Sequence, residues 1–194
     1  MSGAAPFEGL IVDREPAPDV YLLVGIPACG KSTVAEALAK RLSLAAHIEG
    51  DGLQALVVSG GRWPAVDTDP EADRQLLLRA RNAAVLARSF YAGGVVPVID
   101  VVVRRAHLDF YLEQLVDLPL RLVVLAPTAA VAANRIAGRD KKLAEDWSFL
   151  DQAMREERAG QGEWIDSSAL SVEETVDAVL ALPSNGVSTA VRRP

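Results

Sequence analysis

Gly25-Ile26-Pro27-Ala28-Cys29-Gly30-Lys31-Ser32-Thr33 matches the phosphate-loop pattern G-x-x-x-x-G-K-[ST] at every fixed position. The glycines permit backbone angles that are closed to other residues, so consecutive N–H groups can turn inward around a polyphosphate. Lys31 adds positive charge for the β- and γ-phosphates, and the hydroxyl of Ser32 can ligate Mg²⁺. We therefore expect all nine residues to bind a nucleotide.

The segments on either side of this loop have the patterns of a strand and a helix. Residues 20–24 form a nearly continuous apolar run, as expected for a strand that is buried on both faces. Residues 32–42 have apolar side chains at helical spacing. The loop would then precede a helix N-terminus, whose dipole favours an anion. A chance glycine-rich turn is the alternative, and these flanks disfavour it.

The rest of the chain alternates apolar runs with amphipathic segments, which predicts an α/β fold with a parallel sheet and right-handed crossovers. Further strands are expected at about 44–48, 95–100, 120–125 and 163–166. Further helices are expected at about 53–58, 71–91, 106–116, 128–137, 146–159 and 171–182. Pro97 cannot donate a hydrogen bond to a sheet, so either its strand begins after it or the ladder has a gap.

Composition restricts the class of protein. The chain has 194 residues, half of them hydrophobic, which suits a single domain with a large core. A net charge of −6 argues against a nucleic-acid partner held mainly by phosphate contacts. Because Cys29 is the one cysteine and there are two histidines, neither a disulfide nor a zinc cluster is expected, and a bound metal should have oxygen ligands.

No apolar run reaches the roughly 20 residues that cross a bilayer, and residues 1–19 lack the apolar core of a signal peptide. We therefore expect a cytoplasmic protein that does not bind membranes. Residues 1–18 and 184–194 contain little to bury and should be flexible ends of one domain at 19–183.

Two expected strands end in acidic residues. Glu49 and Asp51 follow the strand at 44–48. Ligands of open α/β sheets bind at this edge, so Asp51 should face the same crevice as the phosphate loop, unless it is a solvated turn acid or a helix cap. Glu49 is either a second substrate contact or a salt-bridge partner. Asp100 ends the strand at 95–100, where a carboxylate can reach Mg²⁺ directly or through water; its alternative is a structural role.

Arginines and one tryptophan are candidates for substrate contacts. Arg62 and Trp63 lie in a glycine-rich loop and could hold an acceptor by charge and stacking, or Trp63 is buried under a surface loop. Arg135 and Arg139 lie at the end of an expected helix, where they could contact phosphates or simply be solvated.

Other side chains are expected to be structural. Arg74, Arg79 and Arg81 should form a solvated face of the long helix, with a smaller chance that one reaches the acceptor. His47 is expected to be a packed strand residue.

Taken together, the G-x-P-x-x-G-K-S-T loop, the strand ending Glu49-Gly50-Asp51, the Val98-Ile99-Asp100 strand and the basic turn from Arg135 to Arg139 resemble the small P-loop kinases. The layout of residues 20–182 is most similar to chloramphenicol phosphotransferase-like and zeta-toxin-like proteins, among AAA-type P-loop phosphotransferases. Gluconate, shikimate and adenylylsulfate kinases look like more distant relatives. The resemblance implies a three-layer P-loop NTPase fold, with a five-stranded parallel sheet, helices on both faces and a small helical lid at about 135–147.

The resemblance also implies a reaction. It is the Mg²⁺-dependent transfer of the γ-phosphoryl group of ATP to a hydroxyl of a small molecule, such as an antibiotic, a sugar or another metabolite. Asp51 would be the general base, with Lys31, Arg135 and Arg139 stabilising the transferred group and Ser32 and Asp100 holding the metal. The chain departs from the pattern at Pro97, and at Val101, where some relatives have a second acid.

Alternatives to this reading belong to other functional classes. One is a regulatory switch that binds and slowly hydrolyses a nucleotide, and another is a nucleoside or nucleotide kinase. A polynucleotide-end kinase is disfavoured by the acidic balance. The absence of an Asn/Thr-Lys-x-Asp motif favours ATP over GTP. We expect a monomer or a homodimer.

Overall fold

The computed structural model describes residues 15–63, 69–102, 105–137 and 161–182, and the following statements refer to these. They form a five-stranded parallel sheet in the order β2-β3-β1-β4-β5. The strands are β1 (Val20–Gly25), β2 (Ala45–Glu49), β3 (Val96–Val101), β4 (Leu120–Leu125) and β5 (Glu163–Ile165). The helices are α2 (Lys31–Arg41), α3 (Gly50–Ala55), α4 (Pro70–Ala92), α5 (Arg105–Gln114), α6 (Ala129–Ala137) and α8 (Val172–Ala181).

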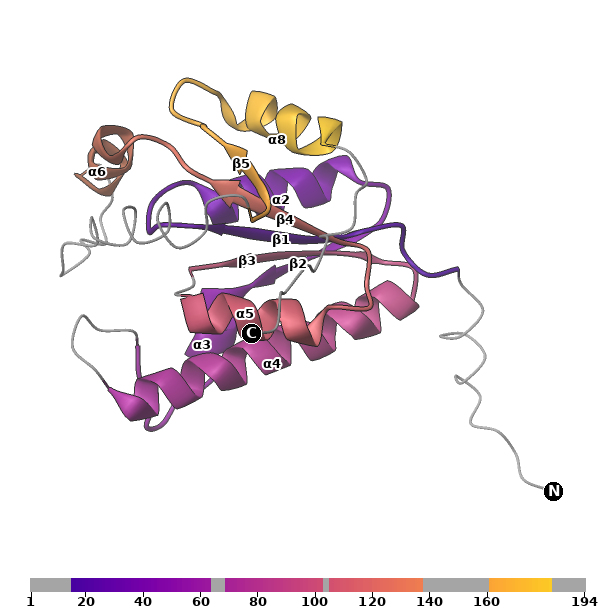
Figure 1. Ribbon diagram of the computed structural model, residues 1–194, viewed down its shortest axis with the longest axis vertical. Coiled ribbons are helices and arrows are strands. Elements are labelled where there is room, and N and C mark those ends of the chain that lie inside the picture. Colours follow the sequence, from indigo (N-terminus) through magenta and orange to yellow (C-terminus); the bar gives the residue numbers. More distant parts are fainter. Residues whose placement is uncertain (1–14, 64–68, 103–104, 138–160, 183–194) are drawn as a thin grey trace, which may run out of the picture.

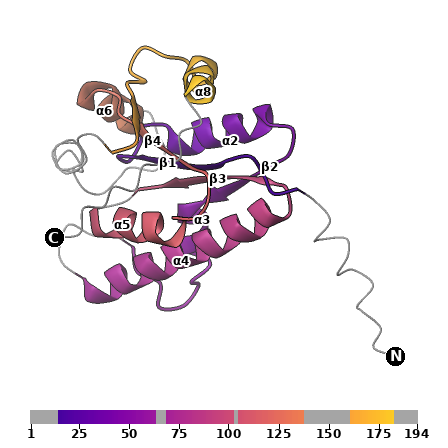
Figure 2. The same cartoon turned by 45° about the vertical axis from the view of Figure 1, so that its right-hand side comes forward.

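Helices cover both faces of the sheet, so the expected three-layer α/β fold is confirmed. Helices α2 and α8 lie on one face, and α3, α4 and α5 lie on the other (Figures 1 and 2). Because successive side chains of a strand point to opposite faces, β1 contributes Leu23 to the core under α2 and α8, and Leu22 to the core over α4 and α5. All six residues of β1 are buried, as the continuous apolar run predicts.

Pro97 lies inside β3, so the alternative in which the strand begins after it is wrong. The backbone nitrogen of Val96 donates to the carbonyl of Leu44, next to β2, at 3.0 Å. Because successive strand residues direct their nitrogens to opposite sides, the nitrogen of Pro97 faces β1. Pairing between β1 and β3 starts one residue later, with Tyr21 opposite Val98. The missing donor of Pro97 therefore falls where that ladder has not yet begun.

The helix expected at 53–58 is instead α3, which starts directly after β2 at Gly50. A Cβ atom at Gly50 would lie 2.6 Å from Val101 Cγ1 and 2.9 Å from the carbonyl oxygen of Asp100. Only glycine lets the chain turn from strand to helix this close to β3. Asp51 consequently lies in the first turn of a helix and not in a free turn after the strand.

Helix α4 matches the expected long helix closely. The side chain of Asp69 caps its N-terminus by accepting hydrogen bonds from the nitrogens of Glu71 and Ala72. Arg74 and Arg81 are exposed, as expected for a solvated face. The expectation is wrong for Arg79, which is only 4% exposed.

The expectation for the C-terminal helix is also confirmed. Ser171 and Glu174 form the expected capping box at the start of α8. Three expected features lie outside the described residues: Arg139, most of the lid expected at 135–147 and the helix expected at 146–159. The expected domain limits at 19 and 183 remain predictions. Among the described helices, none combines the length and apolar character needed to cross a membrane.

Candidate active site

The phosphate loop joins β1 to α2 and is tightly curled. Ala28 and Gly30 have positive φ angles of 61° and 102°, in the left-handed region that glycine adopts most easily. Lys31 is buried, and its Nζ atom donates a hydrogen bond to the carbonyl oxygen of Ile26 at 2.8 Å. The lysine thus reaches back across the loop and bonds to the loop backbone.

Ser32 and Asp100, the two expected metal ligands, are in direct contact. Ser32 Oγ donates to Asp100 Oδ2 at 2.5 Å, although the residues come from α2 and β3. The other carboxylate oxygen, Oδ1, lies 3.0 Å from Nε2 of His47 on β2. This hydrogen bond is the main cause of a raised pKa of His47, in opposition to the effect of burial. Two oxygen donors meet here, the chemistry that Mg²⁺ prefers.

Asp51 and Arg79 form an ion pair of unequal exposure. Arg79 Nη1 lies 3.4 Å from Asp51 Oδ1, and Nη2 donates to the carbonyl oxygen of Val102 at 3.0 Å. The arginine side chain is 4% exposed and the aspartate side chain 63% exposed. The carboxylate is therefore held on one side by a buried cation and is open to solvent on the other.

A buried tyrosine lies beside this pair. Burial raises the pKa of Tyr111 to about 12, while the charge of Arg79 partly opposes the rise. Within the described part of the chain, the Tyr111 hydroxyl and Arg79 Nε have no hydrogen-bond partner. The tyrosine therefore stays neutral and contributes no charge to the site.

Glu49 does not share a strand face with Asp51, because the helix begins between them. Its carboxylate lies beside Gly52, where an added Cβ would be 3.3 Å from Glu49 Oε2. It is exposed at the end of β2, opposite Asp100 of β3. Strand alternation therefore does not relate the directions of these two acids.

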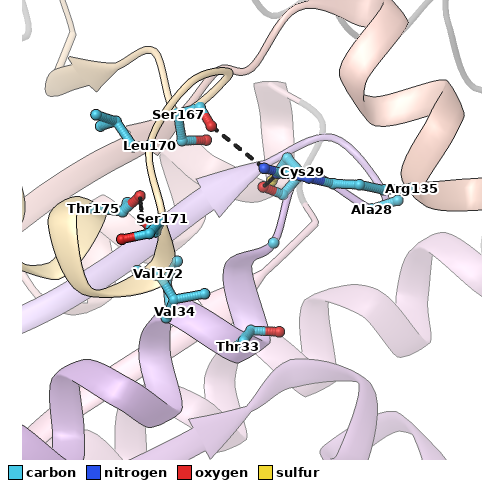
Figure 3. A pocket seen from close by; sticks show the side chains of 11 residues that line it. Ala28, Cys29, Thr33, Val34, Arg135, Ser167, Leu170, Ser171, Val172 and Thr175 are labelled. Carbon is cyan, nitrogen blue, oxygen red and sulfur yellow. Dashed lines mark hydrogen bonds between the residues drawn. The ribbon is translucent and has the colours of Figure 1, made fainter.

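Arg135 is bound to the outer side of the phosphate loop. Its Nη1 donates to the carbonyl oxygen of Cys29 at 2.8 Å, and Nη2 to that of Ser167 at 3.4 Å (Figure 3). Beside it lies a cavity of about 280 Å³ between the loop and the start of α8. Cys29, Thr33, Leu170 and Val172 contribute to its lining. The cavity adjoins the phosphate loop and is partly apolar.

Arg62 and Trp63 lie on the segment between α3 and α4. Arg62 is exposed and Trp63 is 50% exposed, so the alternative of a buried tryptophan is wrong. Figure 1 places the N-terminal end of α4 on the same side of the molecule as the phosphate loop.

The sequence matches the family model described as AAA domain over residues 22–160, more than half of the chain. The chain belongs to the AAA-domain family. A search of curated proteins found no match for this AAA-domain protein.

Several solved structures share its fold. The adenylylsulfate (APS) kinase of Mycobacterium tuberculosis, in complex with AMPPNP and APS, is 14% identical with a TM-score of 0.60, over 86% of this chain and 97% of that one. The tunicamycin resistance protein of Deinococcus radiodurans is 21% identical with a TM-score of 0.58, over 87% and 95%. A gluconokinase of Sinorhizobium meliloti is 23% identical with a TM-score of 0.55, over 86% and 92%. The AAA-domain protein therefore has the fold of P-loop kinases.

Three residues of the site escaped the sequence reading. His47 and Arg79 were expected to be a packed strand residue and a solvated one, and Tyr111 was not singled out. A signal existed for Arg79, because it shares its helix face with Ala72, Leu76, Ala80 and Ala83. No comparable signal existed for His47, since its contact with Asp100 depends on the strand order.

Proposed function

We propose that this protein is an ATP- and Mg²⁺-dependent kinase that transfers the γ-phosphoryl group to a hydroxyl of a small molecule, with Asp51 as general base. One observation carries the proposal. The phosphate loop follows β1, Asp100 lies on β3 and Asp51 follows β2, and these strands are neighbours in the order β2-β3-β1. With strands about 4.8 Å apart, nucleotide phosphates, metal and acceptor would lie in a row about 10 Å long.

Asp51 acts at the acceptor end of this row. Its exposed carboxylate oxygen accepts the proton of the acceptor hydroxyl as that oxygen bonds to the γ-phosphorus and the bond to the ADP oxygen breaks. Arg79 holds the other carboxylate oxygen at 3.4 Å and fixes the orientation of the base. Because Arg79 is buried and also bound to Val102, it positions Asp51 without reaching the acceptor itself.

Lys31 acts at the phosphate end. Its Nζ atom leaves the carbonyl of Ile26, 2.8 Å away, and donates to the β- and γ-phosphates. The loop N–H groups and the lysine then stabilise the negative charge that develops during transfer. Phosphoryl transfer depends mainly on such positioning and charge neutralisation.

Ser32 Oγ and Asp100 Oδ2 would hold Mg²⁺, which supplies neutralisation of phosphate charge when bound. No group of three or more His, Cys, Asp or Glu side chains in the described ranges could hold a metal ion. Two protein oxygens, completed by phosphate oxygens and water, is the usual way in which proteins bind Mg²⁺. His47 orients Asp100 from behind through its hydrogen bond to Oδ1.

The cavity beside Arg135 supports a place for the nucleotide base. It adjoins the loop, and the apolar side chains of Leu170 and Val172 can pack on a purine ring. In the described conformation the guanidinium of Arg135 binds Cys29 and Ser167, so it must leave these carbonyls before it can contact phosphates. Arg139 would join it there. The same proposal includes three further points. The protein is a relative of chloramphenicol phosphotransferase-like and zeta-toxin-like proteins, it is located in the cytoplasm, and its partner is a small molecule.

The proposal is tested by incubating the protein with Mg²⁺-ATP and a panel of hydroxylated metabolites, nucleosides and antibiotics. ADP release is followed, and mass spectrometry identifies any compound that gains one phosphoryl group. Asp51→Asn should abolish the product, while Asp177→Asn, an exposed acid of α8 paired with Arg41, should not. Tight ATP binding without any phosphorylated compound would favour the regulatory switch, and full activity of Asp51→Asn would place the base elsewhere.

A further inference from the structure

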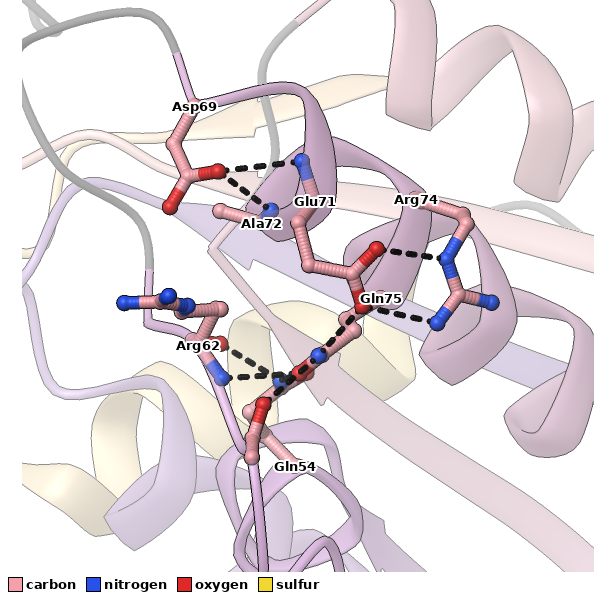
Figure 4. A network of polar contacts seen from close by, with 8 residues as sticks. Gln54, Arg62, Asp69, Glu71, Ala72, Arg74 and Gln75 are labelled. Atoms are coloured by element: carbon pink, nitrogen blue, oxygen red, sulfur yellow. Dashed lines mark hydrogen bonds and ion pairs between the residues drawn. The ribbon is translucent and has the colours of Figure 1, made fainter.

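Two glutamine side chains are buried where helices α3 and α4 meet. Gln54 of α3 is 3% exposed and Gln75 of α4 is 5% exposed. Gln54 Nε2 donates to Gln75 Oε1 at 3.3 Å (Figure 4). Burying an amide is unfavourable unless it is hydrogen-bonded, so a pair in this position calls for a reason other than packing.

The two amides bind the backbone of the segment that leaves α3. Gln54 Nε2 donates to the carbonyl oxygen of Arg62 at 2.7 Å, and the nitrogen of Arg62 donates to Gln75 Oε1 at 2.7 Å. Gln75 Nε2 donates to the carbonyl oxygen of Gly60 at 3.0 Å. Both backbone groups of Arg62 are thus fixed by buried side chains, which is unusual for a surface loop.

The glycines of this segment are needed for its shape. Gly60 has a φ angle of +69°, and a Cβ at Gly61 would lie 2.5 Å from the carbonyl oxygen of Val57. The first position needs the left-handed region and the second needs close backbone approach. Segment 56–63 is therefore built to hold one conformation.

Salt bridges on α4 extend the same network. Gln75 Nε2 also donates to Glu71 Oε1 at 2.7 Å, and Glu71 accepts two hydrogen bonds from Arg74. The hydrogen bond from Arg74, together with that from Gln75, lowers the pKa of Glu71 to about 2. Glu71 stays charged at neutral pH, so the orientation of the Gln75 amide is fixed from this side as well.

The fixed segment is connected to the candidate base. Gln54 follows Asp51 by three residues, about 4.5 Å along the helix axis. Gln75 precedes Arg79 by one turn, so the same two helices join through Asp51–Arg79 and through Gln54–Gln75. Helices α3 and α4 therefore carry both the candidate base and the side chains that bind segment 56–63.

The segment presents a cation and apolar surface. Figure 4 shows the guanidinium of Arg62 directed away from the two glutamines. Trp63 is 50%, Leu56 73% and Val58 93% exposed, although large apolar side chains are normally buried. A rigid loop that carries exposed apolar groups beside a charge has the composition of a ligand-binding surface.

We infer that segment 56–63 recognises the non-reacting part of the acceptor, and that Gln54 and Gln75 are positioning residues that fix it. The acceptor would carry an apolar or aromatic ring next to an anionic group, in addition to its hydroxyl. The ring packs on Trp63 and the neighbouring apolar side chains, and the anion pairs with Arg62. This inference rests on the proposed kinase function for the role of the ligand, but the binding itself needs no phosphoryl transfer.

The probe is 1-anilinonaphthalene-8-sulfonate, which combines fused aromatic rings with one negative charge. It should bind the full-length protein with energy transfer mainly from Trp63, so Trp63→Phe should remove most of this transfer while Trp164→Phe leaves most of it. Arg62→Gln should weaken binding about tenfold, as expected for loss of a charged contact. Unchanged affinity in Arg62→Gln together with unchanged transfer in Trp63→Phe would overturn the inference.

Gln75→Leu tests the positioning role. It should raise the hydrogen-exchange rate of the Arg62 amide about tenfold and weaken probe binding about fivefold, while amides in the middle of α4 keep their protection. Asn82→Leu, at an exposed position of the same helix, is the matched control and should change neither quantity. Faster exchange of the Arg62 amide with full probe affinity would show a purely structural clamp and overturn the positioning role.

Failure of the two proposals can be told apart. Lys31→Ala removes a residue of the proposed phosphate site and should leave probe binding unchanged, because Lys31 follows β1, which β3 separates from β2 and the helix that leads into segment 56–63. An acceptor found in the kinase panel should displace the probe competitively. Failure to displace would overturn the acceptor role of the segment even if the kinase function is established.

Discussion

The nucleotide side and the acceptor side that we propose for this protein are specified by different kinds of sequence information. The nucleotide side is a contiguous run, in which Gly25 to Thr33 form the loop and its flanks form β1 and α2. The acceptor side is assembled from α3, a surface segment and α4, through contacts such as Asp51–Arg79 across 28 positions. The first can be recognised as a motif, while the second exists only once the helices have packed. Variants that separate the two sides therefore test the whole assignment.

Asp51→Asn is expected to give the largest difference between the effect on catalysis and the effect on nucleotide binding. It should lower kcat about 10²- to 10⁴-fold, because the proposed general base is lost, and leave ATP affinity unchanged. Steady-state kinetics with the acceptor from the panel, together with nucleotide titration calorimetry, measure both. A loss of ATP affinity of similar size would mean that Asp51 belongs to the nucleotide side.

Lys31→Ala should impair the proposed nucleotide side instead. We expect ATP affinity to fall about 100-fold, because a buried cation that can reach the β- and γ-phosphates is removed. A fluorescent ATP analogue reports the affinity directly. Lys40→Ala, an exposed lysine of the same helix paired with Glu36, is the control and should bind normally. Equal affinities in the two variants would contradict the phosphate-loop assignment.

The two glycines beside Asp51, Gly50 and Gly52, should differ in how much their replacement by alanine lowers the free energy of unfolding. Gly50→Ala should destabilise the protein by about 1–3 kcal/mol, because its Cβ would meet Val101 and the backbone of Asp100. Gly52→Ala should cost less than about 0.5 kcal/mol, since the atom nearest to its Cβ would be Oε2 of the flexible Glu49 side chain, at 3.3 Å. Urea unfolding measures both. Equal destabilisation would argue against close packing of α3 on β3.

The smallest effect is expected from the histidine that joins the two sides. The pKa of His47 is raised in the folded protein by its hydrogen bond to Asp100. The stabilisation is therefore complete below the unfolded pKa of about 6.5 and is lost as the pH rises through the higher folded value. Without Mg²⁺, the wild-type protein should lose less than about 1 kcal/mol relative to His47→Gln between pH 6 and 9. A stability difference that grows with pH would reverse the assigned sign.

The fold was largely predictable because the buried strands correspond to continuous apolar runs in the sequence. Residues 120–125 were placed without error, and β3 lies one residue later than the expected 95–100. The start of α3 was missed because the steric need for Gly50 depends on Val101, 51 positions later. A local sequence pattern cannot predict a contact between residues so far apart in the sequence.

The candidate site was predictable only in its local parts. The loop, Ser32 and Asp100 follow from pattern, and the contact between Ser32 and Asp100 is present. The burial of Arg79 could have been inferred from the apolar residues on its helix face, but its contacts with Asp51 and Val102 depend on the topology. Gln54 and Gln75 carry no motif, since their partners are backbone atoms of a loop. Residues that act through backbone contacts leave little trace in a single sequence.

The strand order has a consequence for how the proposed kinase could change its acceptor. All residues that we place on the acceptor side lie in one stretch of sequence between β2 and β3. Replacement of residues 50–92 would exchange the selectivity of the protein as a single cassette, with β1, its loop and α2 unaltered. Recombination between relatives at the ends of β2 and β3 would then change which acceptors are bound, while the proposed nucleotide site stays the same.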